Sequence, residues 1–151
     1  MYMLASQELA DLASRDPAKA IARWLHGVNL GARDVYVSVV SLGILASSIE
    51  DMPKQRRDEW RRLLAEARRT FQDTGGILDV DLRVVDIWAT QLQAIDLSEL
   101  DPARGDTRPL GEDERLVIAT AIAHGHTLVS RPRAYLDEIC GNSTLTVVAP
   151  E

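Results

Sequence analysis

Apolar residues in this chain fall into two patterns, short unbroken runs and longer stripes with helical spacing. The clearest run covers residues 35–40, where valine and tyrosine dominate. A β-branched run with little alternation is typical of an interior strand buried on both faces. Shorter runs of the same kind predict further strands at residues 1–4, 77–80, 127–129 and 145–148.

The helical stripes are clearest in residues 54–71, where five apolar side chains share one face and paired arginines occupy the other. Ser6 is expected to cap a helix over residues 8–13, and Pro17 to stand at the first position of a helix over 18–27. Further helices are expected at residues 41–49, 81–92, 112–123 and 134–139.

Glycine and proline mark the breaks between these elements. Gly75 and Gly125 stand where left-handed residues end helices, and residues 97–109, which include Pro102 and Gly105, are expected to form a loop. Strands and helices therefore alternate along the chain. This alternation predicts an α/β fold with a mostly parallel sheet covered by helices on both faces.

Composition adds limits to this picture. A length of 151 residues favours one domain, and a net charge of −6 argues against strong nonspecific affinity for nucleic acid. The single cysteine, Cys140, fits a reducing compartment, and we expect a cytoplasmic protein without a signal peptide or membrane span. The arginine pairs between residues 56 and 69 fit an RNA backbone, but a solvated helix face paired with Glu59 and Glu66 is favoured.

Candidate chemistry gathers in the stretch from residue 110 to 132. Ser130 and Arg131 follow a predicted strand, at the sheet edge where α/β proteins place their sites. Glu112 and Glu114 are candidate metal ligands at the start of the preceding helix. The alternative, which is favoured, is that these acids simply complement the positive end of the helix dipole.

Several segments in order resemble the PIN-domain family, specifically the VapC toxins of bacterial toxin–antitoxin pairs. Residues 3–7 stand where the family has an LDTN-like motif, and residues 38–45 resemble its "SVVTLGEL" segment. Residues 114–121 and 124–132 resemble "DALIAATA" and "HGLTLVTRN", and residues 147–150 resemble the "V-x-NP" ending. The resemblance covers nearly the whole chain.

This resemblance implies a single PIN-like domain over residues 1–151, with three α/β/α layers around a sheet of about five strands. It also implies a metal-dependent ribonuclease that uses Mg²⁺ or Mn²⁺, hard ions that bind oxygen ligands and activate a water molecule. Members of the family usually form homodimers and are neutralised by a small antitoxin protein. The same partners, and RNA, are therefore expected here.

The chain departs from the family at most of its acidic positions. The aspartate of the first motif is Ala5, the glutamate of the second is Ile44, and the last acid falls at Tyr135. Only Glu114 keeps a carboxylate, one methylene longer than aspartate, and it is the one candidate catalytic residue. Because one carboxylate cannot fix a divalent ion against water, nuclease activity is expected to be lost or much reduced.

The remaining candidates leave alternatives open. Ser6, Ser41, Ser130 and Arg131 match polar positions of the family's cleft, although serine is also an ordinary cap. An active enzyme would need a rearranged metal site around Glu114, for which Glu8 and Asp11 are possible ligands. His124 and His126 lack a third ligand in sequence and are expected to have surface roles. A binding protein that keeps the fold without cutting is favoured, whereas a receiver-like module lacks support.

Overall fold

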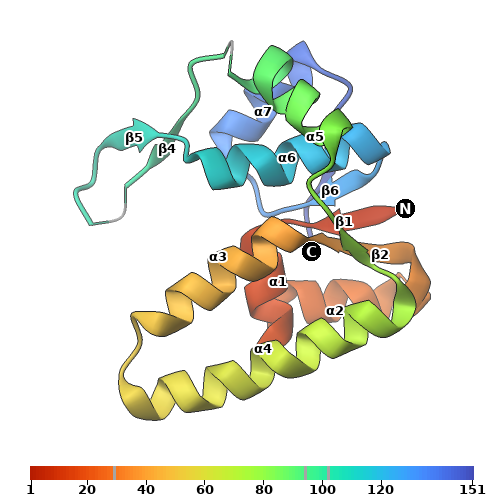
Figure 1. Ribbon diagram of the computed structural model, residues 1–151, viewed down its shortest axis with the longest axis vertical. Helices are drawn as coiled ribbons and strands as arrows, with labels where there is room; N and C mark the ends of the chain where they lie inside the picture. The colour runs from red at the N-terminus through yellow and green to blue at the C-terminus, as the bar shows by residue number, and fades with distance from the viewer. Residues whose placement is uncertain (29, 94, 102) are drawn as a thin grey trace.

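Five short parallel strands form the central sheet in the order β3-β2-β1-β6-β7 (Figure 1). The computed structural model describes residues 1–28, 30–93, 95–101 and 103–151. The strands are β1 (Tyr2–Leu4), β2 (Val35–Ser38), β3 (Ile77–Leu78), β6 (Thr127–Val129) and β7 (Val147–Val148). Every ladder between them is parallel, which confirms the expected α/β class.

Helices cover both faces of this sheet. They are α1 (Ser6–Ala13), α2 (Ala20–Gly27), the 3₁₀ turn η1 (Ala32–Asp34), α3 (Val39–Glu50), α4 (Lys54–Thr74), α5 (Leu82–Ile87), the π-helical turn η2 (Trp88–Leu92), α6 (Glu112–His124) and α7 (Ala134–Asn142). Figure 1 shows α5, α6 and α7 on one side of the sheet and α1, α2 and α4 on the other. The expected three-layer PIN-like architecture is therefore confirmed.

Side chains of the inner strands alternate between the two layers. Met3 and Leu128 belong to the core under α5, α6 and α7, whereas Leu4 and Val129 belong to the core over α1, α2 and α4. All four are essentially inaccessible to solvent. Burying a side chain of this size contributes roughly 1.5–3 kcal/mol. Because consecutive residues of β1 and β6 point to opposite faces, each strand stabilises the packing of both helical layers on the sheet.

Strand β2 is shorter than the apolar run predicts. The strand ends at Ser38, and Val39 and Val40, expected in the strand, instead begin α3. The reason is a cap, because the Ser38 hydroxyl accepts a hydrogen bond from the Val40 amide at 3.1 Å. Strands β3 and β7 also stop short of the expected spans, at two residues each.

Two expected helix starts are wrong. Ala5, not Ser6, stands at the cap position of α1, and Ser6 lies inside the helix with its hydroxyl committed to a distant carboxylate. Pro17 does not begin α2, which starts at Ala20 after a turn closed by the Ala18 amide donating to Asp16. Gly75 and Gly125 do end their helices with positive φ, as expected.

The segment expected to be a loop contains a β-hairpin. Strands β4 (Ser98–Leu100) and β5 (Thr107–Pro109) pair antiparallel and project from the body of the molecule (Figure 1). The cross-strand pair Glu99–Arg108 joins them at 2.8 Å. Most of these residues are exposed. An exposed strand needs no alternating apolar residues, so the sequence lacks the pattern by which a strand is predicted. Pro102, expected within this segment, lies outside the described residues.

The helix α4 has the expected two-sided character. Its own side chains Leu63, Leu64 and Phe71 are buried. Arg62 pairs with Glu66 within the helix, as expected, whereas Arg61 reaches Glu50 of α3 and, more loosely, Asp58 rather than Glu59. Within the described residues, no helix combines the length and the hydrophobicity needed to cross a bilayer.

Candidate functional site

The carboxyl ends of the inner strands bring most of the candidate residues to one edge of the sheet. Ser6 follows β1, Ile44 lies in the helix after β2, and Ser130 and Arg131 follow β6. Glu114 reaches the same edge from the first turn of α6. This is the edge where parallel α/β sheets place their sites, so the position inferred from the sequence fits the fold.

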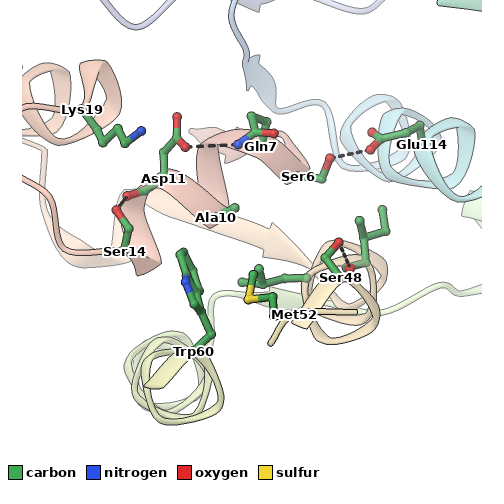
Figure 2. A pocket seen from close by; sticks show the side chains of 12 residues that line it. Ser6, Gln7, Ala10, Asp11, Ser14, Lys19, Ser48, Met52, Trp60 and Glu114 are labelled. Atoms are coloured by element: carbon green, nitrogen blue, oxygen red, sulfur yellow. Dashed lines mark hydrogen bonds between the residues drawn. The ribbon is translucent and has the colours of Figure 1, made fainter. Parts of the chain in front are cut away.

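A hydrogen bond between Ser6 and Glu114 is the centre of this site (Figure 2). The Ser6 hydroxyl donates to the Glu114 carboxylate at 2.5 Å, across 108 residues of chain. Burial raises the pKa of Glu114 above its ordinary value of 4.5, and the negative charges of Asp113 and Glu99 add to this. The serine bond acts in the opposite direction but does not cancel the effect of burial.

The three replaced acidic positions surround this bond with groups that cannot hold a hard cation. Ala5 and Ile44 present only hydrocarbon, and both pack against the core beneath α6. Tyr135 lines the same hollow as Glu114, and burial together with that nearby carboxylate raises the pKa of Tyr135 to about 12. The phenol therefore stays protonated and neutral at physiological pH, where the family resemblance implies a carboxylate.

Glu8 and Asp11 are committed to Arg131. The Glu8 carboxylate, 1% exposed, accepts hydrogen bonds from the Arg131 backbone amide at 3.0 Å and from its Nε at 3.1 Å. Asp11 binds the same guanidinium at 2.6 Å. The ion pairs satisfy most of this charge inside the protein, although Oε2 of Glu8 is buried without a hydrogen-bond partner.

Of the other residues singled out from the sequence, Ser130 lines a hollow together with the Ser6–Glu114 pair, whereas Glu112 and Ser41 do not. Glu112 accepts hydrogen bonds from Trp88 and Gln93, which ties α6 to η2. Ser41 is fully buried, and the Ser130 hydroxyl donates to the neighbouring Arg131 carbonyl at 2.9 Å. The structure therefore brings Glu114, but not Glu112, to Ser6.

The two histidines lie by the start of β6, at the opposite edge of the sheet. His126 stacks on Tyr36 with ring centres 4.7 Å apart, and His124 stacks on His126 at 5.8 Å. Burial, followed by the neighbouring His124, lowers the pKa of His126. Both rings are half-buried and packed, rather than the free surface groups expected from the sequence.

A divalent metal does not fit the side chains present at the site. Within the described residues, no three aspartate, glutamate, histidine or cysteine side chains stand close enough together to hold one ion. Glu114 is the sole carboxylate at the replaced family positions, and its raised pKa shows a setting unfavourable to negative charge. Mg²⁺ and Mn²⁺ require several oxygen ligands, so the implied cofactor lacks a binding site of the family type.

Two hollows meet at the Ser6–Glu114 pair. The first, which we call the main groove, has a volume of about 350 Å³ and runs between α1, α3 and α4 (Figure 2). The second, which we call the hairpin hollow, has a volume of about 260 Å³ and extends to β4, β5 and α7. Ser6, Gln7 and Glu114 line both, so the two hollows adjoin at this pair.

The two hollows differ in chemistry. Ile44, Met52 and Trp60 give the main groove an apolar lining, and Figure 2 shows Trp60 rising from α4 toward α1. Glu99 and Arg108 bring charge to the hairpin hollow. The apolar stripe of residues 54–71 includes Trp60 and predicts a core position for it, and the hairpin residues were expected to form a loop. Acidic and basic residues stand on both sides of Gly105, so charge does not mark the hairpin in the sequence.

Comparisons with solved structures confirm the PIN-like fold. FitAcB from Neisseria gonorrhoeae matches with a TM-score of 0.72 and 20% identity, over 99% of this chain and 98% of that one. VapBC2 from Rickettsia felis, bound to a DNA fragment from its promoter, matches with a TM-score of 0.69 and 16% identity, over 99% and 98%. VapBC-5 from Mycobacterium tuberculosis, of the VapBC family of toxin–antitoxin systems, matches at 0.54 and 15%, over 76% and 81%.

Neither a protein-family model nor a curated protein sequence matches the chain. At these identities the likeness to VapC-type structures is one of fold. The fold expected from the resemblance is confirmed, while its chemistry has to be argued from the residues of this chain.

The raised pKa of Glu114 predicts a specific dependence of stability on pH. Because the folded protein holds this proton more tightly than the unfolded chain, ionisation costs stability as the pH rises from 4.5 through the folded-state pKa. Glu114→Gln keeps an acceptor for Ser6 but has no charge to bury. As the pH rises through this window, the free energy of unfolding of Glu114→Gln is therefore expected to increase relative to that of the native protein.

Urea denaturation between about pH 4 and about pH 7.5 measures this difference. Glu138→Gln, an exposed change of the same chemistry on α7, is the control. Parallel pH profiles for native protein and Glu114→Gln would show that Glu114 titrates normally.

Proposed function

We propose that this chain is a VapC-like protein that binds a small antitoxin-like partner and has lost most or all metal-dependent ribonuclease activity. The observation that carries the proposal is the Ser6–Glu114 hydrogen bond. Glu114 is the one carboxylate at the four positions where the family resemblance implies acids, and its carboxylate is already bonded to Ser6. When bound, a divalent metal would activate water and stabilise charge on a phosphate. With Ala5, Ile44 and Tyr135 in place of acids, this chemistry has no support here.

The main groove supports a polypeptide as the bound partner. Its apolar side chains, Ile44, Met52 and Trp60, offer hydrophobic contact area of the kind that anchors protein interfaces. Lys19 lines the same groove as Asp11 and Glu114, and Asp11 is already paired with Arg131, so the apolar area rather than a net charge supports a protein partner. The FitAcB and VapBC structures are themselves of complexes, which agrees with a protein partner but does not identify one for this chain.

A homodimer and an RNA contact both stay predictions. Exposed apolar side chains on α5, namely Leu82 at 75% and Val85 at 39%, support a contact between copies on that face. The arginine pairs of α4 are partly engaged by Glu50 and Glu66, which leaves less charge for RNA than the sequence suggests. The cytoplasmic location inferred from the single cysteine is also a prediction.

A second candidate function is an active nuclease with a rearranged site. One observation favours it, because Oε2 of Glu8 is buried without a hydrogen-bond partner and Glu8 lines the hairpin hollow with Glu114. Both hydrogen bonds from Arg131 go to Oε1, so Glu8 would offer only Oε2 to an ion. The guanidinium of Arg131, 3.1 Å from Oε1, places a positive charge beside that position and opposes a second cation there.

Cleavage of a mixed RNA substrate in Mg²⁺ and in Mn²⁺ separates these functions. The native chain is expected to cut no faster than buffer, because it lacks ligands for the ion. The variant carrying Ala5→Asp, Ile44→Glu and Tyr135→Asp is expected to gain metal-dependent cleavage, since four carboxylates then face one point. Native cleavage that disappears in Glu114→Gln would instead establish the rearranged site.

Partner binding is tested by producing this chain together with the product of its adjacent reading frame, where that frame encodes a small protein. Trp60→Ala is expected to weaken the complex about thirtyfold, as loss of about 2 kcal/mol from a buried aromatic anchor implies. Trp88→Ala, on the opposite face of the sheet, is the matched control and should leave affinity unchanged. Absence of a complex with the native chain, or equal losses in the two variants, would contradict the assigned groove.

A further inference from the structure

The β4–β5 hairpin forms one wall of the hairpin hollow. Glu99 and Leu100 from β4 and Arg108 from β5 line it together with Glu114 and Tyr135. A segment distant from the sheet thus bounds the same site as the Ser6–Glu114 pair. We call this hairpin, residues 98–109, the strap.

The strap is built as a rigid unit. Its strands are in register from Ser98 opposite Pro109 to Leu100 opposite Thr107. At the tip, the Asp101 amide donates to the Asp106 carbonyl at 2.7 Å, and the Gly105 amide donates to the Asp101 carbonyl at 2.8 Å. Gly105 has a φ of +74°, a value that suits glycine and closes the turn. These bonds allow the strap to keep its shape if it moves as a body.

Its attachment to the rest of the molecule is sparse by comparison. Hydrogen bonds from residues 98–101 and 103–109, as far as the structure describes them, stay within the strap. Leu100 is 67% exposed although it lines the hollow, and the three residues of β5 are all exposed. Figure 1 shows the strap projecting sideways from the body. Little apolar burial therefore fixes its position.

The base of the strap, in contrast, is held by the buried flanking residues Leu97 and Leu110 of the core and by one buried arginine. Arg115, 7% exposed, donates hydrogen bonds to the carbonyls of Leu97 and Leu110, the residues that flank the strap. The same guanidinium also binds the carbonyls of Leu92 and Ile95. Its partners are backbone carbonyls in the two segments that enter and leave the strap. Arg115 therefore links these two segments at the place where a hinge motion of the strap would occur.

Arg115 is the immediate neighbour of Glu114 in α6. Any shift of α6 at the site therefore moves the guanidinium that holds the strap's legs. Leu97 and Leu110 lie together, because the Leu110 amide donates to the Leu97 carbonyl at 2.9 Å. The strap thus has a hinge at Leu97 and Leu110 and a paired β4–β5 body. Arg115, which holds the hinge segments and which we call the latch, belongs to α6, the helix that carries Glu114.

We infer that the β4–β5 hairpin is a hinged strap, latched by Arg115, that opens and closes over the Glu114 site. In the closed position it narrows the hairpin hollow beside α7. An extended polypeptide segment enters when the strap swings out and is then covered by Glu99 and Leu100. The identity of that segment rests on the proposed function, whereas the movement belongs to this chain alone.

Hydrogen exchange of the free protein tests the latch without any partner. Arg115→Met removes the guanidinium and is expected to speed exchange of the Leu110 amide at least about tenfold. The Asp101 amide, inside the strap, and the Ala5 amide, bonded to Val129 of the central sheet, should keep their native rates. Arg104→Met, an exposed change at the tip, is the matched control and should alter none of the three.

A second variant tests whether the strap covers the site. Because Leu97 and Leu110 are bonded neighbours, residues 98–109 are replaced by a two-residue Asn-Gly turn. Ser130, 4% exposed in the same hollow, is changed to cysteine in a Cys140→Ser background. Iodoacetamide is expected to alkylate this thiol at least about fivefold faster without the strap than with it.

Two results would overturn the inference. Equal alkylation rates with and without the strap would show that it does not cover the site. Uniform acceleration of all three amides in Arg115→Met, or of none, would show that Arg115 is not a local latch. Both measurements use the free chain, so they stand even if the chain binds no antitoxin-like partner.

Discussion

The parallel pairing of β1 with both β2 and β6 is the constraint on which the rest of the structure depends. Tyr2 is opposite Val35 on one side and Thr127 on the other, so three strands end at the same level. That register brings Ser6 within 2.5 Å of Glu114 and sets Glu8 against Arg131. The location of the site is therefore set by strand order and does not depend on which side chains occupy it.

At that location the chain has internal contacts where the family resemblance implies metal ligands. A metal centre needs several negative oxygen atoms left unpaired and facing one point. Here Glu114 is bound by a serine and Glu8 and Asp11 by an arginine. Hydrocarbon at Ala5 and Ile44 and a neutral phenol at Tyr135 complete the surroundings. Each of these carboxylates already has a partner within the chain, which suits a binding surface better than an ion site.

Sequence patterns predicted the sheet and most helices because buried strands and helices show a regular spacing of apolar residues in the sequence. β6 has the bounds that its apolar run predicts, and Gly125 ends α6 with positive φ as expected. The patterns failed where the deciding contact is remote or exposed. Ser6 was taken for a cap because Glu114 is 108 residues away, and the exposed β4–β5 strands carry no hydrophobic signal. Glu112 and Glu114 looked equivalent in sequence, but the turn of α6 directs them to different partners.

The central claim is that this PIN-like site does not hold a divalent ion. Titration of Mn²⁺ into the native chain, followed by electron paramagnetic resonance of the free ion, tests it directly. The account predicts that the native chain leaves the free-ion signal unchanged up to about 1 mM Mn²⁺, well above the range of a dedicated carboxylate site. Saturable binding of one Mn²⁺ per chain that is lost in Glu114→Gln would contradict it.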